Sequence, residues 1–258
     1  MKSTNADSVR HALVRPVPDS YDHCIRTNRK KIDVALAKIQ HAEYCRTLQK
    51  LGLSLTWIRV DNALPDCCFV EDTALVFGEK AVICNMRVKS RANEVAEVAK
   101  VMGKLKETYR INPPATIDGG DVLVVEDRVF VGISARTNLH VVAQLKKILE
   151  NSRMNVVPVK IHRVLHLKSA CTYLGNETVI LSRGCFDTNV LHGLGKIFVP
   201  RGEGYAADCL AVNETVLMAK GYAETRKLVE KEGFQVEELE ISEFRKGDGA
   251  LTCLSIIL

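Results

Sequence analysis

The feature that most limits how this chain can fold is a local pattern that occurs four times along it. Each copy has a β-rich segment, a short polar turn and a second β-rich segment, which together predict a β-hairpin. The predicted hairpins cover residues 74–84 (ALVFGEKAVIC), 121–132 (DVLVVEDRVFVG), 171–182 (CTYLGNETVILS) and 209–219 (CLAVNETVLMA). Because similar segments recur at intervals of roughly 40–50 residues, we expect a fold built from repeated units.

Segments with other periodicities lie between the hairpins. Apolar residues recur at helical spacing in residues 93–107, 139–149 and 222–232. Apolar strand candidates occupy residues 49–60, 155–159 and 234–239. These patterns predict a unit of several strands and one helix that is used about five times. The fifth unit combines the N-terminal residues 11–15 with the C-terminal residues 254–258.

Units of this kind cannot bury both of their faces alone, so they tend to close into a ring. We therefore expect an α/β fold that forms a five-unit, pseudo-symmetric α/β propeller. The periodicity also fits an open α/β sheet without symmetry, which is the alternative architecture. No linker rich in Pro, Gly or Ser divides the sequence, so a single domain is expected over residues 1–258.

The composition excludes several classes of protein. The chain is 47% hydrophobic and 26% charged, which is typical of soluble globular proteins. No stretch is as apolar as a membrane span, and Met1–Asn5 lacks the apolar core of a secretory signal, so we expect a cytoplasmic protein without a membrane partner. The net charge of +5 is dispersed, with Arg29–Lys31 as the longest basic run, and no nucleic-acid partner is expected.

The nine cysteines include no C-x-x-C pair and have no histidine pair at metal-binding spacing. We expect reduced thiols and no structural zinc site. Most such cysteines behave as small buried apolar residues, so context must identify a reactive one. Cys253 has such a context, because it follows the glycine-rich segment Gly247–Gly249 and precedes a short apolar run at the end of the chain. It is the candidate nucleophile.

The segment at residues 64–72 (LPDCCFVED) supplies several carboxylates. A guanidinium group has a delocalised positive charge and paired N–H groups, and carboxylates accept such pairs of hydrogen bonds. We predict that Asp66, Glu71 and Asp72 bind a guanidinium group. The alternative is that Glu71 and Asp72 only solvate a strand end, although the apolar residues on both sides weaken this interpretation.

His166 and Asp118 complete the candidate catalytic set. Imidazole titrates near neutral pH, so His166 can protonate a departing amine and then activate water, while Asp118 orients the ring. Taken alone, His166 is more typical of a buried structural histidine, and residues 118–121 (DGGD) equally fit a tight turn. Arg91 and Arg136 suit a substrate carboxylate. In a ring of units the connecting loops meet near the axis, which would bring these residues together.

Several short motifs occur in a characteristic order along nearly the whole chain. They are residues 64–72 (LPDCCFVED), 90–91 (SR), 116–123 (TIDGGDVL), 132–138 (GISARTN), 166–169 (HLKS) and 248–253 (DGALTC). With these motifs the sequence resembles the dimethylarginine dimethylaminohydrolase family of the guanidino-group modifying (pentein) superfamily. The resemblance implies the pentein fold, which is a five-unit α/β propeller.

The resemblance also implies a role for each candidate residue. Cys253 would be the nucleophile, His166 the general acid and base, and Asp118 the partner that orients His166. The implied substrate contacts are Asp66, Glu71, Asp72, Arg91, Arg136 and the backbone of Gly247. A mobile loop would cover the pocket at about residues 19–31, with Ile25 as its apolar contact.

The expected activity is hydrolysis of an Nω-methylated arginine to citrulline and a methylamine through a covalent thiouronium intermediate on Cys253. No metal or organic cofactor is expected, and the protein should be a monomer or a homodimer. A thiolate beside an imidazole also suits a soft metal, so we predict that zinc inhibits the enzyme. The alternatives are deimination of arginine to citrulline and ammonia, and, more remotely, a non-catalytic ribosome-binding protein of the same fold.

Overall fold

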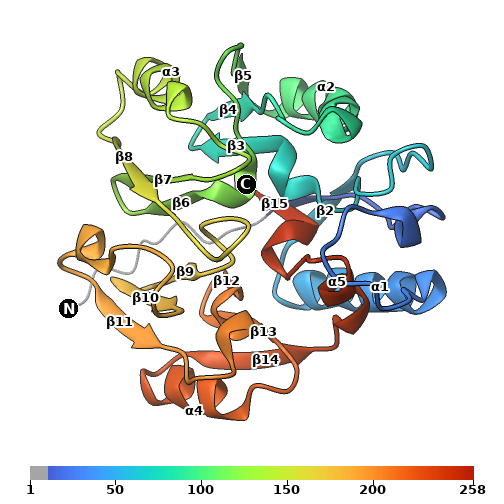
Figure 1. The fold of residues 1–258 in the computed structure, drawn as a ribbon, viewed down its shortest axis with the longest axis vertical. Coiled ribbons are helices and arrows are strands. Elements are labelled where there is room, and N and C mark those ends of the chain that lie inside the picture. The colour runs from blue at the N-terminus through green and yellow to red at the C-terminus, as the bar shows by residue number, and fades with distance from the viewer. Residues whose placement is uncertain (1–10) are drawn as a thin grey trace.

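The computed structural model describes residues 11–258. The first ten residues of the predicted domain, including the Met1–Asn5 segment, lie outside this range. Within it the strands form five three-stranded sheets. Figure 1 shows these sheets arranged around the middle of the molecule. None of the helices among residues 11–258 is both long and apolar enough to cross a membrane.

All four predicted hairpins are confirmed. Each is an antiparallel pair of strands joined by a short turn, as the alternation of β-formers and polar turn residues requires. The pairs are β3 (Ala74–Phe77) with β4 (Lys80–Ile83), β6 (Val122–Val125) with β7 (Arg128–Ile133), β9 (Cys171–Gly175) with β10 (Thr178–Leu181), and β12 (Leu210–Val212) with β13 (Thr215–Ala219).

A third strand completes each of these sheets by pairing in parallel with the second hairpin strand. The third strands are β5 (Glu107–Arg110), β8 (Asn155–Lys160), β11 (Gly195–Phe198) and β14 (Gln235–Leu239). The predicted helices supply three of the crossovers, as α2 (Val95–Leu105), α3 (His140–Ile148) and α4 (Ala223–Lys231). Strands β5 and β11 were not predicted from the sequence; both are short, β5 is largely exposed, and only one residue of β11 is buried.

The prediction of a helix in every unit is wrong for the third hairpin. Between β10 and β11 the described chain forms only the short 3-10 helix Thr188–Leu191 instead of an α-helix. This crossover contains Gly184 and Gly193, whose φ angles are +74° and +80°. Positive φ values interrupt a right-handed helix, so the connection stays irregular.

The predicted union of the two chain ends is confirmed. Strand β1 (His11–Val14) pairs antiparallel with β15 (Ser255–Ile257) and parallel with β2 (Ser54–Trp57). The crossover between β1 and β2 is α1 (Val34–Lys50), most of which was not predicted from the sequence, whereas the strand predicted within residues 49–60 is confirmed as β2. The Asp33 side chain begins this helix by accepting a hydrogen bond from the Leu36 N–H at 3.0 Å.

Buried apolar side chains connect each sheet to the next. Because such burial is the main favourable contribution to folding, these clusters hold the units together. The connecting groups are Leu13 with Ala74, Val82 with Val131, Phe130 with Val179, and Leu174 with Leu217 and Ala12. The apolar clusters thus run from the first sheet around to the last and back to the first.

Three candidate segments occupy matching positions in different units. Each forms a short 3-10 helix directly before the first strand of a hairpin or the closing strand. These helices are Val70–Thr73 before β3, Gly119–Asp121 before β6, and Thr252–Leu254 before β15. The equal register places the predicted carboxylates and the thiol at the same end of the sheets.

Candidate active site

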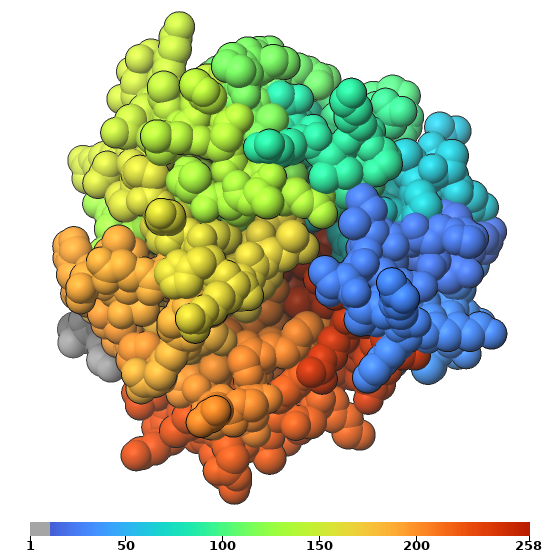
Figure 2. Space-filling model, in the orientation of Figure 1, coloured from blue at the N-terminus to red at the C-terminus, as the bar shows by residue number. Residues whose placement is uncertain are grey.

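A narrow pocket of about 30 Å³ lies where segments from several units meet. Figure 2 shows the middle of this face hollowed, with the red C-terminal segment deep inside and blue N-terminal and yellow central segments at its sides. Eight of the ten predicted site residues line the pocket: Ile25, Asp66, Asp72, Arg91, Arg136, His166, Gly247 and Cys253. The structure therefore brings together residues that are far apart in the sequence.

Two predicted residues, Asp118 and Glu71, do not line the pocket. Asp118 is completely buried and accepts a hydrogen bond from His166, with 3.2 Å between His166 Nε2 and Asp118 Oδ2. Glu71 accepts a hydrogen bond from Lys168, with 2.6 Å between Glu71 Oε1 and Lys168 Nζ. Both carboxylates thus support groups that surround the pocket.

His166 lies between two carboxylates. Its Nε2 faces Asp118, while its Nδ1 lies 3.9 Å from Asp72 Oδ1. Burial lowers the pKa of His166, but the Asp72 charge, the hydrogen bond to Asp118 and the Asp121 charge outweigh this and raise the pKa to about 9. At neutral pH the imidazole is therefore protonated and ready to donate a proton.

Cys253 is half-buried and lines the same pocket as His166. It lies within the 3-10 helix Thr252–Leu254, which is anchored by a hydrogen bond of 2.9 Å from Thr252 Oγ1 to Asp208 Oδ1. Burial raises the pKa of the thiol well above its ordinary value, and the nearby charges of Asp208 and Glu71 raise it further. The thiol is therefore neutral in the empty pocket, and a cationic ligand would favour the thiolate.

Asp121 and Asp208 are buried acidic groups of the site that were not among the predicted site residues. Asp121 accepts hydrogen bonds from the Leu167 N–H at 3.0 Å and from Ser134 Oγ at 2.6 Å, which fixes the segment that carries His166. Burial raises the pKa of Asp208 to about 7, with a further contribution from the Glu71 charge. Asp121 is the first residue of one predicted hairpin and Asp208 directly precedes another, and this similar position was the signal available in the sequence.

The two arginines that line the pocket have different surroundings. Arg91 is buried and forms hydrogen bonds to Asp72 Oδ2 at 2.7 Å and to Glu94 Oε2 at 2.8 Å. A third hydrogen bond joins it to the Phe69 carbonyl at 3.2 Å. Arg136 Nη1 lies 3.7 Å from Asp118 Oδ2 but makes no hydrogen bond within residues 11–258. Arg136 is therefore the arginine with unused hydrogen-bonding capacity.

Within the loop at residues 19–31, Ile25 lines the pocket. The Ile25 N–H donates to both oxygens of Asp66, at 3.1 and 3.3 Å, and the Thr27 N–H and hydroxyl donate to Asp248. Burial raises the pKa of Asp66. A cavity of about 30 Å³ is much smaller than the pockets that hold organic ligands, so we expect a lining segment such as this loop to move before such a ligand enters.

Four other pocket residues were not among the candidates, and all of them except Leu165 come from the motifs. Phe69, Leu165, Asp248 and Gly249 complete the lining. Asp248 has a φ of +58° and its carboxylate holds the loop at residues 19–31 through Thr27. Aspartate tolerates this left-handed conformation better than most residues, which was a usable signal in the segment around Gly247.

The close packing of Gly120 explains the glycine pair that follows Asp118. A Cβ atom on Gly120 would lie 2.6 Å from His166 Nδ1, and one on Gly119 would lie 2.0 Å from the Glu71 carbonyl oxygen. Neither residue has a positive φ, so the glycines are required by close approach and not by a special turn conformation.

Gly120→Ala is expected to reduce turnover by about 10–100-fold, because the added methyl group would push the His166 ring away from Asp118. Steady-state kinetics on the purified variant measures this. Gly103→Ala is the matched control, since Gly103 lies in α2 and a Cβ there meets nothing within 4 Å. Equal turnover by Gly120→Ala and the wild type would contradict the assigned position of the imidazole.

Asp72, Asp118 and His166 are the residues that could hold a metal ion, since their ligand atoms lie within 4.8 Å of one another. A histidine has to be deprotonated to bind a metal. Because the pKa of His166 is raised to about 9, the site favours a proton over a metal ion at neutral pH. Zinc inhibition through Cys253 and His166 stays a prediction.

Comparison with known proteins identifies the family. A family model described as N,N dimethylarginine dimethylhydrolase, eukaryotic, matches residues 16–189. The N(G),N(G)-dimethylarginine dimethylaminohydrolase of Pseudomonas aeruginosa is 32% identical over 250 residues, which cover 96% of this chain and 98% of that protein. This chain belongs to the dimethylarginine dimethylaminohydrolase family. The protein of the same name from Streptomyces coelicolor is 34% identical, with 96% of this chain and 97% of that protein covered.

The fold also agrees with solved structures of the dimethylarginine dimethylaminohydrolase family. A cysteine-to-serine variant of the Pseudomonas aeruginosa enzyme in complex with citrulline matches with a TM-score of 0.94 and 31% identity, covering 97% of this chain and all (100%) of that chain. An adduct of a dimethylarginine dimethylaminohydrolase with S-methyl-L-thiocitrulline matches with a TM-score of 0.93 and 31% identity, with the same coverage of 97% and 100%. The predicted resemblance is therefore confirmed.

Proposed function

We propose that this chain hydrolyses Nω-methylated arginine to citrulline and a methylamine. The observation that carries this proposal is that Cys253, His166 and the carboxylates Asp66 and Asp72 line one closed pocket. The family relatives named above are dimethylarginine dimethylaminohydrolases, and one of them is solved with citrulline. Deimination of arginine uses the same side chains but is not favoured by these relatives.

In the first half of the reaction, the positive charge of the bound guanidinium favours the thiolate, and the Cys253 thiol loses its proton to solvent because His166 is already protonated. Cys253 Sγ attacks the central guanidinium carbon and forms a carbon–sulfur bond, while the electrons of one carbon–nitrogen bond leave with the methylated nitrogen. His166, which is protonated at neutral pH, donates a proton to that nitrogen. A methylamine departs, and an S-alkylthiouronium group remains on Cys253.

In the second half, neutral His166 accepts a proton from a water molecule as the oxygen attacks the same carbon. The carbon–sulfur bond then breaks and the electron pair returns to sulfur, which releases citrulline. Asp118 remains hydrogen-bonded to His166 and keeps the ring oriented through both steps. Every step uses side chains and water, without a metal or organic cofactor.

Substrate recognition is assigned to charged groups that line the pocket. Asp66 and Asp72 accept hydrogen bonds from the guanidinium, and Arg136 binds the substrate carboxylate because its Nη1 has no hydrogen bond among residues 11–258. Gly247 contributes backbone, and Ile25 covers the bound ligand after the loop closes. Glu71 acts indirectly, since Lys168 pairs with its carboxylate.

We further propose that the five sheets form a closed α/β propeller and that residues 1–258 make one domain. The apolar clusters that return from the last sheet to the first support this closure. The ligand that the domain takes is a small guanidino amino acid.

Parallel assays with Nω,Nω-dimethyl-L-arginine, L-arginine and agmatine test the proposed function. We expect citrulline and dimethylamine from the methylated substrate, with kcat/KM at least about tenfold above that for arginine. Faster release of ammonia from arginine would instead identify an arginine deiminase. Lack of turnover with every guanidine would favour the non-catalytic binding protein.

The Cys253 thiol should react slowly with iodoacetamide at neutral pH, and its rate should rise about tenfold per pH unit without levelling off near about pH 8.5, where an ordinary cysteine thiol ionises. The reason is that burial and the Asp208 and Glu71 charges raise the pKa of the thiol, so the reactive thiolate becomes populated only as the pH rises. Peptide mass spectrometry after quenching measures the rate. A rate at Cys253 that is already constant around neutral pH would contradict the raised pKa.

A further inference from the structure

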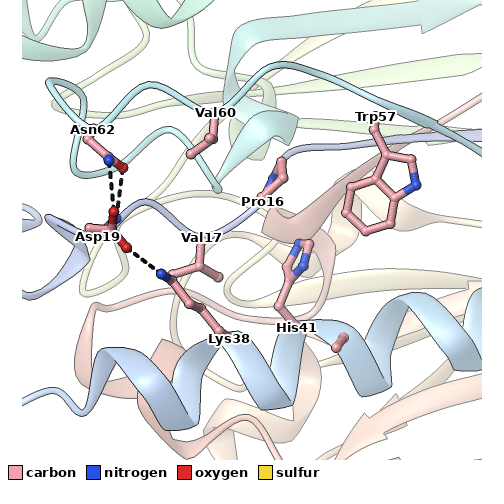
Figure 3. Close-up of a pocket in the computed structure, with 9 residues that line it drawn as sticks. Pro16, Val17, Asp19, Lys38, His41, Trp57, Val60 and Asn62 are labelled. Carbon is pink, nitrogen blue, oxygen red and sulfur yellow. Dashed lines mark hydrogen bonds and ion pairs between the residues drawn. The ribbon is translucent and has the colours of Figure 1, made fainter.

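A second cavity of about 400 Å³ lies between α1 and the segments that follow β1 and β2. This volume is within the range of pockets that hold small organic molecules. Figure 3 shows the cavity, with His41 from α1 facing Pro16 and the ring of Trp57 on one side. None of the residues that line it also lines the Cys253 pocket, so the cavity is a separate site.

His41 is a buried polar group aimed into this cavity. His41 is only 4% exposed, and its Nε2 has no hydrogen-bond partner within residues 11–258. The other ring nitrogen, Nδ1, lies 3.7 Å from the Cys45 Sγ. Buried polar groups normally have a partner, so the free nitrogen indicates that the cavity accepts a polar atom.

The contact with Cys45 determines which atom Nε2 can bind. Burial lowers the pKa of His41 to about 4 and raises the pKa of Cys45 to about 12, so both groups are uncharged at neutral pH. A thiol is a weak donor and a weaker acceptor, while a neutral imidazole nitrogen is a good acceptor. The Cys45 thiol therefore donates to Nδ1, and His41 Nε2 carries the proton that points into the cavity.

The walls of the cavity are aromatic and apolar. The Trp57 ring is close to the His41 ring, with centroids 6.1 Å apart and an interplanar angle of 61°, yet Trp57 remains 52% exposed. Pro16, Val17 and Val60 complete the apolar wall. An exposed indole beside a buried N–H suits a flat ring that carries a hydrogen-bond acceptor.

The charges at the rim neutralise one another. Asp19 pairs with Lys38 and accepts a hydrogen bond from Asn62 Nδ2 at 2.8 Å, as the dashed lines in Figure 3 show. The Asp19 N–H in turn donates to Asn62 Oδ1 at 2.9 Å. Because these groups already have partners, the rim does not select a charged ligand.

We propose that this cavity binds an uncharged aromatic molecule with a carbonyl group. The ring lies against Trp57, and the carbonyl oxygen accepts the hydrogen bond from His41 Nε2. The proposal is independent of the hydrolytic reaction, since neither His41 nor Trp57 contacts the Cys253 pocket.

Trp57 is the single tryptophan of the chain, so its fluorescence reports directly on the cavity. Titration with benzamide is expected to change the emission in a saturable way, with a Kd on the order of 1 mM for so small a ligand. His41→Phe, which keeps a ring but removes the donor, should weaken binding about tenfold. His41→Gln keeps a donor and should bind more tightly than His41→Phe. Ile39→Ala, an exposed change on the same helix outside the cavity, should bind like the wild type.

Circular dichroism first establishes that each variant is folded. Absence of a saturable change in the wild type, or equal affinity in the wild type and folded His41→Phe, would overturn the proposal. Light scattering tests a different occupant, namely a second copy of the chain. If Trp57 emission depends on protein concentration in step with dimer formation and benzamide does not bind, the cavity is an interface between copies and the proposal is wrong.

Discussion

Cys253→Ser is expected to lower citrulline formation from Nω,Nω-dimethyl-L-arginine by at least about 10⁴-fold. A serine hydroxyl is a much weaker nucleophile than a thiolate, and the buried surroundings that raise the pKa of the thiol would oppose its ionisation too. Single-turnover and steady-state assays of citrulline measure the loss. Because the two side chains differ only by oxygen in place of sulfur, the fold and the affinity for citrulline should change little.

Cys185→Ser is the matched control for this variant. Cys185 is also a free cysteine, but it is buried in the crossover between β10 and β11 and does not line the pocket. We expect its turnover to stay within about threefold of the wild type, since substitutions away from the site act mainly on stability. A Cys253→Ser protein with more than a few per cent of wild-type turnover would contradict the covalent mechanism.

The parts of the fold that the sequence predicted are those set by local pattern. Each hairpin needs only a polar turn between two β-rich segments, and both signals lie within a dozen or so residues. The pairing of β1 with β15 could be predicted because four units were already assigned to the hairpins, which left the two chain ends to form the fifth unit. Its register, such as Leu13 opposite Ile256, was not readable, because it depends on contacts between the two ends of the chain.

Helix α1 was missed because its surface does not follow hydrophobic periodicity. Gln40, His41 and Thr47 are buried, while Ile39 is 62% exposed. A pattern search therefore sees polar residues where the core lies and an apolar residue where solvent lies. Tertiary packing of the aromatic cluster around His41, which includes Phe244 and Trp57, decides this helix.

The same limit applies to the site. The sequence identified the acidic pair Glu71 and Asp72 but did not separate their positions, because adjacent residues of a 3-10 helix point in different directions. In the structure Asp72 lines the pocket, whereas Glu71 pairs with Lys168. The partners that decide this, Lys168 and Arg91, come from other segments, so no local pattern contains the information.

The sequence predicted that Arg91 contacts the substrate, but the structure shows that its side chain is bonded to other protein groups. Its guanidinium is already engaged by Asp72, Glu94 and the Phe69 carbonyl, in surroundings that exclude water. Burial raises the pKa of Glu94 to about 7 even though the Arg91 charge opposes this. Without the arginine, two buried carboxylates would face each other with no compensating charge, which is a severe cost.

Arg91→Met is therefore expected to lower the free energy of unfolding by about 3–5 kcal/mol, as for other buried ion pairs that lose one partner. Urea denaturation followed by circular dichroism measures this. Arg136→Met is the comparison variant, since Arg136 Nη1 makes no hydrogen bond among residues 11–258 and lies 3.7 Å from Asp118 Oδ2, and it should raise KM while costing less stability than Arg91→Met. The opposite result, in which Arg91→Met is as stable as the wild type and changes only KM, would show that Arg91 acts mainly by binding substrate. A partial recovery of stability in the double variant Arg91→Met/Glu94→Gln would locate the cost in the uncompensated carboxylate, because the second change removes one of the two buried charges.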